Sequence, residues 1–140
     1  MKEIKEYIRI ICKDLGISVP NVRFTKSFKG SDTRLAEYDS HSNILMLSSR
    51  YENVLDLYFC VAHELRHKYQ LDKDIYDFSS YVTSSTVDIK TYNMQEIELD
   101  ANAYAYVIMA NVFGVEPLFN GLDEDVKKKI IRRAIKIVNQ

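Results

Sequence analysis

Tryptophan is absent from this sequence of 140 residues, and glycine, proline and cysteine are scarce, with 4, 2 and 2 residues. So little glycine and proline excludes collagen-like and linker-rich chains, while 46% hydrophobic residues is typical of a globular protein. Neither sign of charge dominates, because 19 basic and 20 acidic residues leave a net charge of -1. Without a cationic excess we expect neither nucleic acid nor a membrane as a partner. The length predicts a single domain over residues 1–140.

Long hydrophobic runs are missing as well. Charged residues interrupt the apolar residues of the stretch Met1–Leu15, so we expect neither a signal-peptide core nor a membrane span, and we expect a cytoplasmic location. The two cysteines, Cys12 and Cys60, lie far apart and form no C-x-x-C pattern. They are interpreted as buried thiols rather than as metal ligands or a disulfide.

Hydrophobic periodicity predicts an α+β fold with four helices and a small sheet. The helices are expected over about residues 4–15, 49–70, 93–113 and 123–139, and capping-box patterns at Ser49–Glu52 and Asn93–Glu96 mark the starts of the second and third. Strand patterns at 19–24, 35–38 and 44–47, with a polar turn over 39–43, predict an antiparallel sheet. Residues 72–88 are polar and weakly periodic, which indicates an irregular connection.

The most informative pattern is the pentapeptide His63-Glu64-Leu65-Arg66-His67. Histidines four residues apart project from the same face of a helix, so both imidazoles can reach one metal ion while the glutamate points to its side. This is the arrangement of H-E-x-x-H zinc enzymes, and it lies within a strongly apolar predicted helix. The pattern predicts a zinc site with His63 and His67 as ligands.

A catalytic zinc ion needs a third protein ligand and one open position. A carboxylate is preferred to His41, because the extended pattern that supplies a third histidine is absent. Glu96 and Glu98 lie on nearly opposite sides of the third predicted helix, so only one of them can face the metal. Glu98 is favoured, because Glu96 already has a role as the reciprocal cap of Asn93.

Two polar residues are candidates to orient the ligands. Asn102 follows Glu98 by one helical turn, and Gln70 shares the helix face of His63 and His67. Gln70 has an open alternative, since it would equally well face solvent.

The residues from His63 to His67, followed by Glu98-Leu99-Asp100-Ala101-Asn102-Ala103-Tyr104-Ala105, resemble the H-E-x-x-H and E-x-x-A-N-x-F/Y-A pair of ImmA/IrrE-type zinc metallopeptidases. The resemblance covers about residues 1–113. It implies a zincin-like, gluzincin-type minimal fold, with an N-terminal helix, the small sheet, the H-E-x-x-H helix, a glutamate helix and a C-terminal helix. It also implies Zn²⁺ held by His63, His67 and Glu98, with Glu64 as general base. Members of that family cleave regulatory proteins such as repressors on mobile elements.

The function predicted from this sequence is therefore zinc-dependent endopeptidase activity on a specific, repressor-like regulatory protein. Glu64 would take a proton from the attacking water and return it to the leaving amine. Ile44 and Met46 are candidate substrate-binding residues, because residues 44–47 are expected to form an exposed sheet edge to which a peptide can pair. Tyr38, Tyr69 and Tyr92 are candidates to stabilise the oxyanion.

Two other functions remain open. A metal-containing module without catalytic activity could sequester a regulator. A nucleic-acid-binding protein could instead use the basic residues of the last predicted helix.

Overall fold

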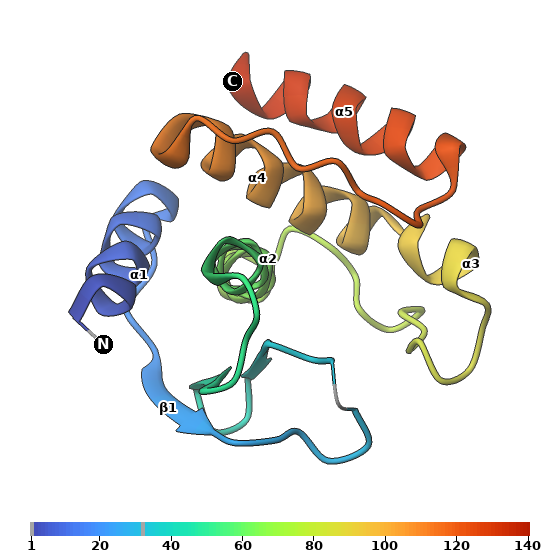
Figure 1. The fold of residues 1–140 in the computed structure, drawn as a ribbon. Helices are drawn as coiled ribbons and strands as arrows, with labels where there is room; N and C mark the ends of the chain where they lie inside the picture. Colours follow the sequence, from blue (N-terminus) through green and yellow to red (C-terminus); the bar gives the residue numbers. More distant parts are fainter. Residues whose placement is uncertain (1, 32) are drawn as a thin grey trace. The chain divides into compact units, whose positions relative to one another are not determined.

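The computed structural model describes residues 2–31 and 33–140. The chain divides into two compact units, Met1–Lys73 and Asp74–Gln140, and Figure 1 shows the elements of each. The α+β class is confirmed by the helices and the small sheet of the described residues. The single domain over residues 1–140 stays a prediction.

The first unit begins with α1 (Lys2–Leu15). Its apolar residues recur at helical spacing and bury one face, on which Ile4, Ile8 and Ile11 are fully inaccessible to solvent. Gly16 ends the helix with a φ of 68°, a left-handed conformation that glycine adopts without steric cost. The helix predicted over about residues 4–15 is confirmed.

The sheet of the first unit contains β1 (Asn21–Thr25), β2 (Ala36–Asp39) and β3 (Ile44–Ser48) in the order β1-β3-β2. β2 and β3 form the predicted antiparallel hairpin, but β1 pairs with β3 in parallel. The expectation of a wholly antiparallel sheet is therefore wrong. The residues between β1 and β2 bring the chain back across the sheet, so that β3 runs in the same direction as β1.

β3 is the central strand, since it pairs with β1 on one side and with β2 on the other. The prediction that residues 44–47 form an exposed edge is therefore wrong. Leu45 and Leu47 of β3 are fully buried, and the helix α2 (Val54–Asp72) contacts β2 and β3. The inner face of the sheet thus lies under the helix that carries the His-Glu-Leu-Arg-His motif.

α2 starts later than predicted, at Val54, with Asn53 as its N-cap. The Asn53 side chain accepts a hydrogen bond from the Leu55 backbone N–H at 2.9 Å. Ser49, the predicted cap, instead donates its hydroxyl to the carbonyl of Thr25 at 3.2 Å. The capping-box prediction at Ser49–Glu52 failed because the sheet holds the backbone of this segment.

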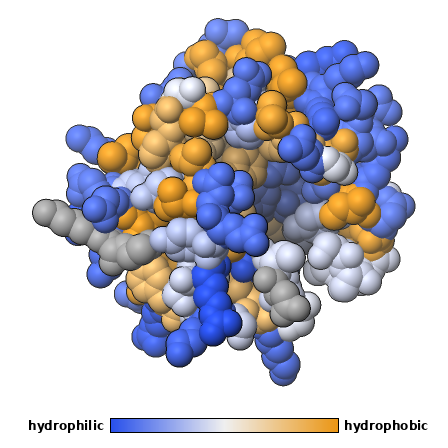
Figure 2. Space-filling view, in the orientation of Figure 1, coloured by the Kyte–Doolittle hydropathy of each residue, from blue (hydrophilic) through white to orange (hydrophobic). Residues whose placement is uncertain are grey.

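The second unit contains α3 (Ile89–Asn93), α4 (Glu96–Phe113) and α5 (Glu124–Val138). α4 and α5 pack along their lengths through a core of small and branched residues, Leu99, Ala103, Val107, Val126, Ile130 and Ala134. Gly114, with a φ of 64°, follows the end of α4 at the predicted boundary, and Asp123 is the N-cap of α5, one residue before the helix begins. The face of the molecule in Figure 2 shows hydrophobic and hydrophilic side chains in small interspersed groups.

The start of α4 differs from the prediction. Asn93 ends the separate short helix α3, whose N-cap is Asp88, and α4 begins after Gln95. Gln95 makes no side-chain cap. Its amide instead bonds to the backbone of Val82, accepting from N–H at 2.9 Å and donating to the carbonyl at 3.0 Å. The capping box at Asn93–Glu96 is therefore wrong, because Gln95 is used to fix the preceding connection.

No helix of the described residues has the length and apolar character needed to cross a bilayer.

Candidate metal centre

His63 and His67 lie on successive turns of α2, which runs without interruption through the motif. Their Nε2 atoms are 3.1 Å apart and the two rings meet edge to face, with centroids 4.7 Å apart. The spacing of four residues places both imidazoles on one helix face, as the sequence predicts. Two nitrogen donors of the kind that zinc prefers are thus directed at one point.

Gln70 contacts the second of these histidines, with its Oε1 atom 2.8 Å from Nδ1 of His67. The side chain is fully buried, so the alternative that it faces solvent is wrong. Because a carboxamide oxygen only accepts hydrogen bonds, Nδ1 of His67 carries the proton and Nε2 presents its lone pair. The predicted contact is therefore present in the first unit.

Glu64 lies beside the histidines and is oriented by the sheet. Its Oε1 atom accepts a hydrogen bond of 2.8 Å from the backbone N–H of Tyr38, and its Oε2 atom is 3.8 Å from Nε2 of His63. Tyr38 belongs to β2, the edge strand, and this N–H points away from β3. A carboxylate held in this position is available to exchange a proton with a molecule next to the histidines.

The three tyrosines proposed for the oxyanion have other contacts. The hydroxyl of Tyr38 donates to Oδ1 of Asn43 in the hairpin turn at 2.9 Å, and the ring of Tyr69 lies 4.5 Å from the guanidinium carbon of Arg66. Tyr92 belongs to the second unit, where its hydroxyl meets that of Tyr81 at 3.1 Å. The structure assigns no oxyanion donor among these three.

Glu98 lies on α4 in the second unit and is only 1% exposed. The hydroxyl of Tyr81 donates a hydrogen bond of 2.8 Å to its Oε2 atom. Burial, followed by the negative charge of Glu98, raises the pKa of Tyr81 well above its ordinary value. The tyrosine therefore stays protonated and remains a donor to the carboxylate.

Glu96, the alternative carboxylate, is bound elsewhere. It forms an ion pair with Arg133 of α5, and its side chain is 62% exposed. The same guanidinium lies 3.7 Å from Asp100, one turn further along α4. The choice of Glu98 over Glu96 as the third ligand stays a prediction. Asn102, one turn after Glu98, is buried at 8% exposure, but no described contact tests its predicted role.

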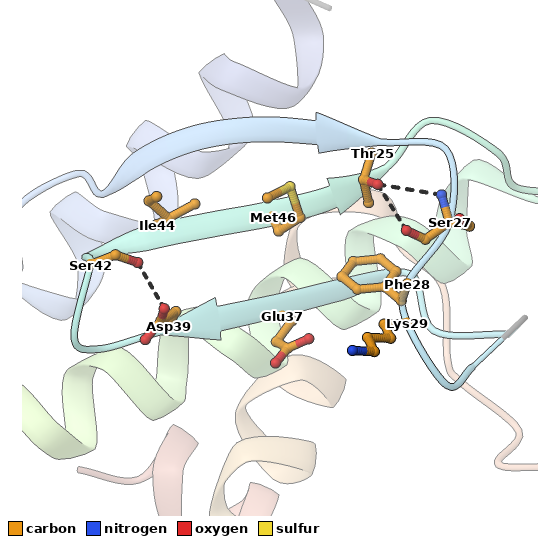
Figure 3. Close-up of a pocket in the computed structure, with 9 residues that line it drawn as sticks. All are labelled: Thr25, Ser27, Phe28, Lys29, Glu37, Asp39, Ser42, Ile44 and Met46. Carbon is orange, nitrogen blue, oxygen red and sulfur yellow. Dashed lines mark hydrogen bonds between the residues drawn. The ribbon is translucent and has the colours of Figure 1, made fainter.

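Ile44 and Met46 lie on the other face of the sheet. Their cross-strand partners are Asp39 and Glu37, and all four side chains line an open hollow of about 290 Å³. The hollow is also lined by Thr25, Ser27, Phe28 and Lys29 (Figure 3). Leu45, with the opposite orientation, is the residue that faces inward. The exposed edge on which their predicted role depended is therefore absent, and their side chains face away from α2 because side chains alternate between the faces of a strand. Substrate binding by Ile44 and Met46 stays a prediction.

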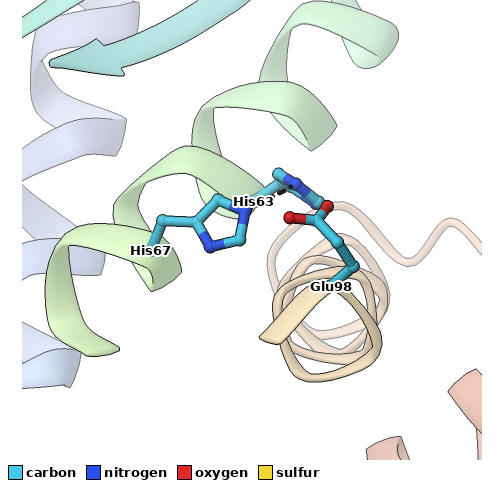
Figure 4. A group of neighbouring side chains, drawn as sticks. All are labelled: His63, His67 and Glu98. Atoms are coloured by element: carbon cyan, nitrogen blue, oxygen red, sulfur yellow. Dashed lines mark hydrogen bonds between the residues drawn. The ribbon is translucent and has the colours of Figure 1, made fainter. Parts of the chain in front are cut away.

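Figure 4 shows the side chains of His63 and His67, from α2, and of Glu98, from α4. Two imidazoles and one carboxylate are donors of the kind that could hold a metal ion. The same donor set binds zinc in catalytic sites that keep a fourth position open.

Tyr81 is the residue of this region that the sequence did not reveal. It lies in the connection over residues 72–88, where weak periodicity predicted only irregular structure. The available signal was compositional, namely a tyrosine placed among polar residues shortly before the glutamate helix.

Comparisons of the chain with protein-family models, with curated proteins and with solved structures gave no match.

Proposed function

We propose that the protein is a zinc-dependent endopeptidase in which His63, His67 and Glu98 bind one zinc ion. The observation that carries the proposal is the convergence of the two Nε2 atoms, 3.1 Å apart, with the Glu64 carboxylate held beside them by the Tyr38 N–H. A pair of imidazoles alone would indicate only that a metal ion can bind. The adjacent, separately oriented carboxylate supplies the general base that hydrolysis needs.

The role of each side chain follows from its contacts. Zinc held by this donor set supplies Lewis acidity, which polarises a carbonyl group and lowers the pKa of water. Glu64 accepts a proton from the water whose oxygen attacks the carbonyl carbon, and it returns this proton to the amine nitrogen as the C–N bond breaks. Gln70 keeps His67 in the tautomer whose Nε2 is a donor to the metal.

A peptide substrate would pair with β2 rather than with β3. β2 is an edge of the described sheet, and its Tyr38 N–H reaches Glu64. An extended chain added at this edge would present its carbonyl groups near the general base. We further propose that the substrate is a repressor-like regulatory protein and that the reaction takes place in the cytoplasm.

Metal analysis tests the zinc site. We expect one zinc ion per wild-type chain after dialysis, and loss of the ion in His63→Ala and in Glu98→Ala. X-ray absorption of the zinc-loaded protein should show two imidazole ligands and oxygen donors at the distances of about 2.0–2.2 Å usual for zinc. A zinc ion that survives both substitutions would refute this ligand set.

Cleavage of a protein-derived peptide library, read by mass spectrometry, tests the reaction. Glu64→Gln preserves the size of the side chain but removes the proton acceptor. It should keep the zinc ion and lower the cleavage rate by about 10² to 10⁴-fold. Cleavage at equal rates by both proteins would refute the role of Glu64. A wild type that holds zinc and cleaves neither the library nor a verified binding partner would favour the metal-containing binding module instead.

A further inference from the structure

Tyr81 connects the irregular segment of the second unit to the carboxylate of α4. Its hydroxyl oxygen is 2.8 Å from Oε2 of Glu98 and 3.1 Å from the hydroxyl oxygen of Tyr92. A carboxylate only accepts hydrogen bonds, so Tyr81 donates its single proton to Glu98. Tyr92 must then donate to Tyr81. The three groups form a chain of hydrogen bonds in one direction, from Tyr92 through Tyr81 to Glu98.

The backbone next to Tyr81 is held in place from α4. The side-chain amide of Gln95 bonds to both the N–H and the carbonyl of Val82, at 2.9 and 3.0 Å. The same amide nitrogen donates to the carbonyl of Tyr92 at 3.0 Å. These three hydrogen bonds of Gln95, the N-cap residue of α4, thus fix the positions of both tyrosines relative to the start of the helix.

We propose that Tyr81 is a positioning residue, which orients Glu98 as a metal ligand through one of its two oxygens. This inference rests on the proposed zinc site. The hydrogen bond from Tyr81 holds the carboxylate by its Oε2 atom and so restricts the rotation of the Glu98 side chain. Tyr92 strengthens the arrangement, because a hydroxyl that accepts one hydrogen bond becomes a better donor of another.

Outer hydrogen bonds of this kind typically contribute 10 to 100-fold to metal affinity. A second tyrosine of the same segment allows a matched control. The hydroxyl of Tyr76 accepts a hydrogen bond of 2.7 Å from Arg133, which lies on α5. Tyr76→Phe therefore removes a tyrosine hydroxyl from the same connection without changing the contact at Glu98.

The experiment measures zinc affinity by competition with a chromophoric chelator for wild type, Tyr81→Phe and Tyr76→Phe. The visible spectrum of each protein loaded with Co²⁺ gives a second readout. We expect Tyr81→Phe to bind zinc about 10 to 100-fold more weakly. Its Co²⁺ bands should lose intensity, because the released Oε2 can join the ion and raise its coordination number. Tyr76→Phe should match wild type in both measurements.

Incorporation of 4-aminophenylalanine at position 81 restores an N–H donor on a ring of the same shape. It should recover affinity and spectrum, which a purely structural role of the hydroxyl does not predict, and it keeps the test open if Tyr81→Phe fails to fold. If wild type binds zinc and Tyr81→Phe binds it with the same affinity and the same Co²⁺ spectrum, the role of Tyr81 is refuted and the zinc site is not. A wild type that binds no zinc would refute the zinc site and this role together. Equal losses in Tyr81→Phe and Tyr76→Phe would also refute it.

Discussion

Lys68 offers a sharp test of how this fold accommodates a buried charge. Its side chain is only 3% exposed, whereas the side chain of its partner Asp72 is 39% exposed, and the ammonium nitrogen lies 2.5 Å from Oδ2. The same nitrogen is 3.3 Å from the hydroxyl of Ser18, in the connection after α1. The two members of this ion pair therefore differ in their access to water.

This asymmetry predicts unequal effects of removing each partner. Asp72→Asn leaves the buried ammonium without its counter-charge, and a buried charge without a partner costs about 3–5 kcal/mol. We expect about 3 kcal/mol, the low end, because water can reach the exposed side of residue 72. Lys68→Met keeps the apolar stem and leaves Asp72 accessible to solvent, so the free energy of unfolding should fall by about 1 kcal/mol or less.

Urea unfolding followed by circular dichroism measures both variants, with the slope m checked against that of wild type. Ser18→Ala is a matched control, since it removes a partner of Lys68 and leaves both charges in place. Equal losses for the two charge variants, or a larger loss in Lys68→Met, would show that the burial of Lys68 does not govern the energetics of the pair.

Other substitutions test the remaining assignments. Glu98→Ala should lower zinc affinity by orders of magnitude. Glu96→Ala loses only a partly exposed ion pair, so it should lower the free energy of unfolding by less than about 1 kcal/mol and leave zinc affinity unchanged. The reverse pattern in a zinc titration would exchange the roles of the two glutamates. Asn53→Ala removes the cap of α2 and should lower the free energy of unfolding by about 1 kcal/mol, and an unchanged urea midpoint would contradict this. Burial raises the pKa of Cys12 from 9.0 to about 11, a shift that the positive charge of Lys68 partly opposes. The resulting stability is complete below pH 9 and lost as pH rises through about 11, so at pH 8 iodoacetamide should modify native Cys12 far more slowly than the urea-unfolded thiol.

The four longer helices of this fold could be predicted because their signals are local. Ile4, Ile8 and Ile11 mark the buried face of α1 at helical spacing, and Gly16 marks its end. Their starts were harder to predict, because the capping-box pattern competes with nearby backbone partners. Ser49 bonds to Thr25 in the sheet rather than to its own helix.

In the candidate site, too, contacts within one helix could be predicted and contacts between distant segments could not. His63, Glu64, His67 and Gln70 share one helix, so their spacing alone predicts the contacts of the histidines and the glutamine. Tyr81 reaches Glu98 only because of the way an irregular segment folds back on α4. No spacing rule relates a residue in such a connection to a helix that follows it.

The central strand shows why the placement of Ile44 and Met46 could not be predicted. A sequence shows which residues of a strand face the core only when apolar and polar residues alternate along that strand. Residues 44–47 are all apolar, so the pattern leaves open which pair faces α2. The structure shows which pair it is, because Leu45 and Leu47 are fully buried.

The polar partners Glu37 and Asp39 on the neighbouring strand carried the missing signal, since cross-strand neighbours share a face. Applied to the hairpin, that rule places Ile44 and Met46 on the polar face of the sheet, together with Asp39 and Glu37.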